Sequence, residues 1–220
     1  MPVPAAAGLE GKLAFTITVP DSWYELDLEP ATRRESIRRL VEERVRDTDL
    51  WDQRRTLQKL LEEQSGFAHE SGATYCAAFS MPTDAGPVTG SVVVTLVESP
   101  GSDAAESFRV LGRSFTEVPR TGDPLAPYAE TDMVDLPGSG SCPRTSGIED
   151  TPVGDGGYVR NVFSLTAVPV HELNRVFLVA ASSPVLPLAD VLLDLFDAVT
   201  GTFRVVRPDR LREDPTGPSD

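Results

Sequence analysis

The chain has 220 residues, of which 40% are hydrophobic and 25% charged, and its formal net charge is −14. These values are typical of a globular protein and exclude a disordered one. The acidic balance argues against nucleic acid or anionic lipid as a partner, because both need a basic face. No run of about 20 apolar residues and no N-terminal signal pattern is present, so we expect a cytoplasmic protein.

The first part of the chain predicts one strand and two helices. Residues 1–11 are expected to be a flexible arm, and apolar residues alternate along 13–19 as in a half-buried strand. Thr32 and Glu35 have the spacing of a capping box, which predicts a helix starting there. A second helix is expected over about 49–69. Its predicted inner face consists of Leu50, Leu57, Leu60, Leu61 and Gln64.

The middle of the chain reads as strands joined by turns. Strands are predicted over 73–80 and 91–98 with a hairpin at 82–87, and again over 130–136, 141–149, 158–168 and 175–181. Residues 102–113 are a helix candidate, and 119–127 are expected to be a loop. The run Val176–Val179 is apolar on both faces, which predicts a central strand.

The last helix has the clearest pattern in the sequence. Leu188, Val191, Leu192, Leu195, Phe196 and Val199 recur at helical spacing. Gly201 is expected to close this helix, and residues 202–206 to form a short strand. Residues 207–220 are expected to be a disordered tail. The elements together predict a single α+β domain over 12–206, with a mostly antiparallel sheet and helices packed on it.

Both ends of this predicted domain resemble a known family. The opening strand that runs into Val19-Pro20-Asp21-Ser22-Trp23 is similar to the start of Mog1/PsbP-like domains, and residues 188–206 resemble their last helix and strand. The chain also resembles uncharacterised actinobacterial proteins. The resemblance implies an α/β/α sandwich and an accessory, partner-binding role.

The residues that could carry chemistry do not form a recognisable motif. His69 and His171 lack metal-ligand spacing, and the two cysteines, Cys76 and Cys142, are too few for a thiolate metal site. Cys142, in the segment 138–143, is the strongest candidate nucleophile, but it would need a base and a lowered pKa. The glycines at 154–157 precede a strand, and Asp155 would repel phosphate. We therefore predict no catalytic residue, no metal and no cofactor.

Charge is distributed unevenly along the chain. Residues 32–63 hold nine of the 20 basic side chains and eight acidic ones. They could pair with one another on solvated helix faces, as Glu42 and Arg46 would at i, i+4. Alternatively, Arg34 and Arg38, which share a helix face, could dock the acidic face of another protein or a second copy of the chain. Trp51 would anchor that contact, unless it fills the core.

We therefore predict a non-enzymatic cytoplasmic accessory or adaptor protein that acts through protein–protein contacts, such as a subunit of a larger bacterial assembly or secretion system. The alternative is a small-molecule-binding protein or weak hydrolase that uses the open face of the sheet. Neither nucleic acid nor membrane is expected as a partner.

Overall fold

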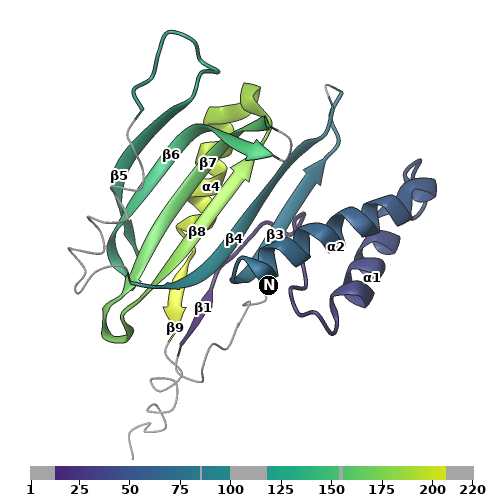
Figure 1. Ribbon diagram of the computed structural model, residues 1–220, viewed down its shortest axis with the longest axis horizontal. Coiled ribbons are helices and arrows are strands. Elements are labelled where there is room, and N and C mark those ends of the chain that lie inside the picture. The colour runs from purple at the N-terminus through teal and green to yellow at the C-terminus, as the bar shows by residue number, and fades with distance from the viewer. Residues whose placement is uncertain (1–12, 85, 100–117, 154–155, 207–220) are drawn as a thin grey trace, which may run out of the picture.

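The computed structural model describes residues 13–84, 86–99, 118–153 and 156–206. A seven-stranded sheet dominates it, with the order β2-β3-β4-β8-β7-β6-β5 and antiparallel pairing throughout (Figure 1). The predicted α+β fold with a mostly antiparallel sheet is confirmed. In sheet order the strands are Tyr24–Glu25, Ala73–Met81, Val88–Glu98, Arg175–Ser183, Gly157–Val170, Gly140–Val153 and Tyr128–Leu136.

Short connections explain most of this pairing, because a tight turn returns the chain beside the strand it has just left. Residues 82–87 join β3 to β4, residues 137–139 join β5 to β6, and the 3-10 turn η2 (His171–Leu173) joins β7 to β8. β8 lies in the middle of the sheet between β4 and β7. Its apolar run is thus central, as predicted.

One face of the sheet is covered by α4 (Ala189–Thr200) and by a two-stranded sheet of β1 (Ala14–Thr16) and β9 (Arg204–Val206) (Figure 1). The ring of Phe15 on β1 lies 5.4 Å, centroid to centroid, from both Phe177 on β8 and Phe203 before β9. Leu192 and Phe196 of α4 join the same core. Burial of these side chains holds the layers together.

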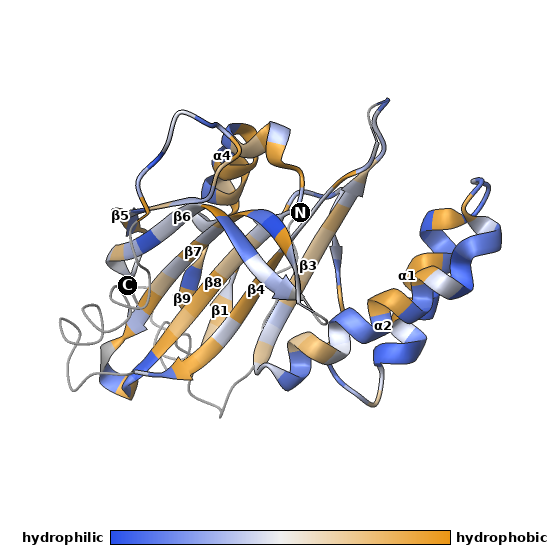
Figure 2. Cartoon of the chain, turned by 45° about the horizontal axis from the view of Figure 1, so that its top comes forward, coloured by the Kyte–Doolittle hydropathy of each residue, from blue (hydrophilic) through white to orange (hydrophobic). Residues whose placement is uncertain are grey.

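The helices α1 (Arg33–Val45) and α2 (Arg54–Glu70) form a hairpin that projects from the β2–β3 edge, joined through the 3-10 turn η1 (Trp51–Gln53) (Figures 1 and 2). The hairpin has a small core of its own, made by Ile37, Val41 and Val45 with Leu57 and Leu61. Ser65 is fully buried, and its Oγ donates a 2.6 Å hydrogen bond to the carbonyl of Asp27. This bond ties α2 to the segment that follows β2.

The predicted details of the hairpin need two corrections. Thr32 precedes α1 but makes no side-chain capping bond, because its own backbone is already helical. Glu35 instead accepts a 2.6 Å hydrogen bond from Arg38 Nη2. The inner face predicted for the second helix includes Leu50, Leu60 and Gln64, yet all three are exposed. Leu50 lies before η1 and outside α2, and α1 packs against Leu57 and Leu61 instead of Leu60.

The last helix also differs from its prediction in detail. Leu192, Phe196 and Val199 are buried, whereas Leu188 and Val191 are exposed, so the buried stripe is narrower than expected. Gly201 follows the helix with φ −59°, not in the left-handed conformation of a typical closing glycine. The predicted arm 1–11, the helix candidate 102–113 and the tail 207–220 lie outside the described residues.

Candidate functional site

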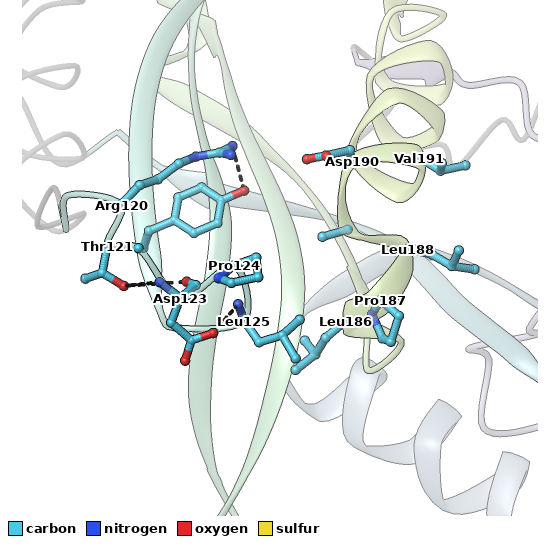
Figure 3. A pocket seen from close by; sticks show the side chains of 13 residues that line it. Arg120, Thr121, Asp123, Pro124, Leu125, Leu186, Pro187, Leu188, Asp190 and Val191 are labelled. Carbon is cyan, nitrogen blue, oxygen red and sulfur yellow. Dashed lines mark hydrogen bonds between the residues drawn. The ribbon is translucent and has the colours of Figure 1, made fainter.

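A cleft of about 600 Å³ lies between the loop before β5 and the 3-10 turn η3 (Leu186–Leu188), which leads into α4 (Figure 3). The two walls come from segments about 60 residues apart in the sequence, and it is the packing of α4 on the sheet that brings them together. The lining residues are Arg120, Thr121, Gly122, Asp123, Pro124, Leu125, Tyr128, Leu186, Pro187, Leu188, Ala189, Asp190 and Val191.

Hydrogen bonds within the loop fix the first wall. Asp123 Oδ1 accepts a 2.9 Å bond from the amide of Leu125, and Thr121 Oγ1 accepts a 3.3 Å bond from the amide of Asp123. The Leu125 carbonyl accepts a 3.2 Å bond from Arg160 Nη1 on β7. The bonds accepted by Asp123 and Thr121 form the local turns that Asp and Thr side chains favour. The loop therefore has a defined shape although it contains no regular element.

The charged end of the cleft is organised around Tyr128. The Arg120 guanidinium lies 4.1 Å from the centre of the Tyr128 ring and donates a 2.9 Å bond to the phenol oxygen. Arg120 Nε also donates to Glu130 Oε1 at 3.1 Å. Burial raises the pKa of Tyr128, and the Glu130 and Asp190 carboxylates raise it further, although Arg120 opposes them. The phenol therefore stays protonated near neutral pH.

The apolar side of the cleft comes from both walls. In Figure 3, Leu125 and Leu186 point toward each other across the opening, and Asp190 points toward the wall that carries Arg120. Leu188 and Val191 point to the outer side of the turn and continue the apolar surface beyond the cleft. Leu125 is 40% exposed and Val191 65%. The cleft thus presents exposed apolar side chains between charged groups.

Two polar groups of the cleft, Arg120 and Asp123, are already engaged in holding it together. The Asp123 carboxylate supports the loop, and Arg120 is paired with both Tyr128 and Glu130. This arrangement suits recognition, in which apolar contact gives affinity and fixed charges give orientation.

The sheet face opposite α4 was the expected site of the alternative function. Cross-strand register places Val93, Ala180 and Leu165 in one row on this face. Ala180 is exposed, and Val93 and Leu165 are partly exposed. Met133, on the same face of β5, is 52% exposed. This face thus carries exposed apolar side chains among Ser and Thr residues such as Thr145 and Thr131.

The three predicted binding residues lie on the helical hairpin, but not in one patch. The side chain of Arg34, near the start of α1, is 90% exposed, and its Nε lies 4.0 Å from Glu62 Oε1 of α2. Arg38 is held between Glu35 and Glu42 of its own helix, at 2.6 and 3.1 Å. Trp51 is 39% exposed in η1, under the guanidinium of Arg54. It lies at the far end of α1 from Arg34, a separation of about 20 Å for a 13-residue helix.

The tryptophan of the opening motif, the cysteines and His69 lie in the core or on the surface. Trp23 is buried, with its ring 4.6 Å from that of Phe79. Cys142 is fully buried on β6, and burial raises the pKa of its thiol to about 11, as it does for Cys76. A thiol in that state is a poor nucleophile at neutral pH. His69 is exposed on α2.

Two features are absent from the part of the chain that the structure describes. None of the helices in the described ranges is long and apolar enough to cross a membrane. Within the same ranges, no three His, Cys, Asp or Glu side chains gather in a way that could hold a metal ion.

Reasoning from the sequence missed the cleft. The available signals were the loop rich in Pro and Gly at 119–127 and the apolar Leu186-Pro187-Leu188 before the last helix. Neither signal shows that the two segments meet.

Comparison with known proteins gives a similar solved structure. No family model and no curated protein matches the sequence. Among solved structures, the chain is similar to that of LpqN, a protein involved in cell envelope biogenesis of Mycobacterium tuberculosis. The two chains share 12% identity, and the TM-score of the match is 0.47. The match covers 94% of this chain and 91% of that one. The resemblance to Mog1/PsbP-like domains stays a prediction.

Proposed function

We propose that this chain is a non-enzymatic accessory protein that binds another protein, and that the cleft between the 118–127 loop and α4 receives an apolar side chain of that partner. One observation carries the proposal: Leu125 of the loop and Leu186 of η3 point toward each other across this cleft, and Leu125 leaves 40% of its surface exposed. Exposed apolar patches bordered by charge are typical of protein-binding surfaces.

The geometry also indicates what the partner should present. An apolar anchor would contact Leu125 and Leu186, where it would remove apolar surface from water. Asp190, on the first turn of α4, is exposed beside this contact and would favour a basic group next to the anchor. The net charge of −14 would attract the same kind of segment from a distance.

The test compares partner recovery by charge-introducing variants of the full chain. Leu125→Asp and Leu186→Asp should each lower recovery of the bound protein from cells of the native host by about tenfold or more, as expected for a central interface residue. Met133→Asp is the matched control, because Met133 is an exposed apolar residue on the opposite face of the sheet. Quantitative mass spectrometry of the co-purified proteins gives the readout, with circular dichroism as the check on folding.

The outcomes separate the proposed site from its alternative. Loss with both cleft variants and retention with Met133→Asp would support the cleft. Loss with Met133→Asp alone would move the binding site to the opposite sheet face. Recovery unaffected by either folded cleft variant would overturn the proposal.

A further inference from the structure

Helix α2 is apolar on two sides, and only one of them is used within the chain. Leu57 and Leu61 pack against α1. Leu60 and Phe67, seven residues apart and therefore on one face, are 49% and 74% exposed. Gln64 lies between them and is uncharged. A surface helix normally has a single apolar stripe, so the second one indicates a packing partner.

Charge indicates which partner suits this face. Residues 32–70, which span the hairpin, contain nine Lys or Arg and nine Asp or Glu, so their net charge is zero. The whole formal charge of −14 therefore belongs to the rest of the chain. The rest of each copy carries this negative charge and would repel the rest of the other copy, whereas two hairpins can meet with little net repulsion.

The hairpin is also placed so that a second copy can reach it. It stands away from the β2–β3 edge in both views of the molecule (Figures 1 and 2). Lys59 lies 3.7 Å from Glu63 on its own helix, so these charges beside the apolar stripe are paired. The stripe can be covered without burying an isolated charge.

We propose that two copies of this chain associate through α2, antiparallel about a two-fold axis near Gln64. Leu60 of one copy then faces Phe67 of the other, and the contact occurs twice, as a closed two-fold interface requires. With α1 of each copy behind it, the assembly is a four-helix bundle that carries one sheet domain at each end. This interface is separate from the cleft beside α4 and does not depend on the function proposed for it.

The first test is the mass of the full chain in solution. Sedimentation from about 1 to about 100 µM, a range in which moderate dimers dissociate, should show the wild type approaching twice the monomer mass of 23.7 kDa. The double variant Leu60→Glu, Phe67→Glu should stay monomeric with an unchanged circular dichroism spectrum. Val191→Glu, at an exposed apolar residue outside the hairpin, should still dimerise.

The second test fixes the position of the axis. Gln64→Cys should form a disulfide between copies on mild oxidation, because residues near the axis meet within the roughly 7 Å that a disulfide allows between Cα atoms. Arg39→Cys, on the exposed side of α1, should not, and the native thiols are buried. A wild type that is monomeric throughout the range, or a double variant that still dimerises, would overturn the proposal.

Discussion

The backbone carbonyl of Tyr128 lies in the space that a β-carbon on Gly147 would occupy. Gly147 has φ 157°, and its partner across β5 and β6 is Ala129. The absence of a side chain at Gly147 lets β5 approach β6 closely, and so places Tyr128 at the charged end of the cleft. A glycine in mid-strand thus shapes the candidate site.

Gly147→Ala should therefore destabilise the protein by about 1–3 kcal/mol or more, because the added methyl group must displace backbone atoms. Denaturant unfolding measures this change. Gly122→Ala is the control, since nothing lies within 4 Å of a β-carbon there. Equal stability of the two variants would contradict the packing described for β5 and β6.

Much of the fold could be predicted because local patterns determine it. The run Val176–Val179 is apolar on both faces and therefore indicates a central strand. The burial of Leu192, Phe196 and Val199 follows from their helical spacing. The inner face of α2 could not be predicted, because this helix is apolar on two sides. The sequence does not show whether the side with Leu57 and Leu61 or the side with Leu60 is buried. The hydrogen bond from the buried Ser65 to Asp27 helps to fix the rotation of α2 about its axis. That contact spans 38 residues, so no local pattern predicts it.

The candidate site was less predictable than the fold. Both walls of the cleft are irregular segments, and their meeting depends on how α4 lies across the sheet. The side chain of Arg144 on β6 pairs with Asp197 of α4, a contact that helps to fix this placement and that no local pattern reveals. Helical spacing and residue type predict a shared surface for Arg34, Arg38 and Trp51, whereas Arg34 and Trp51 lie at opposite ends of α1.

The buried thiols should make the protein less stable in alkali. Burial raises the pKa of both Cys76 and Cys142 from an ordinary value of 9.0 to about 11. Between these values the unfolded chain releases thiol protons that the folded chain retains, so the free energy of unfolding should fall as pH rises from 9 to 11. Urea unfolding under reducing conditions at several pH values measures this fall.

Cys142→Ala should make that decline shallower, because one of the two thiol contributions is removed. In the folded wild type neither thiol should react with a disulfide reagent at neutral pH, whereas both should react once the chain is unfolded. Rapid reaction of Cys142 in the folded protein would show that its burial is wrong.

The last helix allows a comparison of a buried and an exposed face. Phe196→Ala should lower the free energy of unfolding by about 3–5 kcal/mol, because this side chain is fully buried. Asp194→Ala and Val191→Ala, on the exposed side, should each change it by less than about 0.5–1 kcal/mol. Chemical denaturation gives the ranking, and a larger effect at Asp194 than at Phe196 would contradict the observed helix rotation.

A variant at Arg38 tests whether the arginines of α1 pair with carboxylates of their own helix or are free to bind a partner. The hydrogen bond from Arg38 lowers the pKa of Glu35, and the charges of Arg38 and Arg39 lower it further. Arg38→Gln should therefore raise the pKa of Glu35, which titration followed by carboxyl NMR can measure. Arg34→Gln is the matched control, because Arg34 pairs with Glu62 on the other helix and should leave Glu35 unchanged.

The interaction of Arg38 with Glu35 should also make the stability difference between the wild type and Arg38→Gln depend on pH. A carboxylate whose pKa is lowered on folding stabilises the protein above its unfolded pKa, and that contribution is lost as pH falls through the folded value. The melting temperature of Arg38→Gln should thus lie below that of the wild type at pH 7, and the gap should close below about pH 4.5 and in high salt. A gap that persists in acid, with the pKa of Glu35 unmoved, would show that Arg38 is not engaged within α1 and is available to a partner.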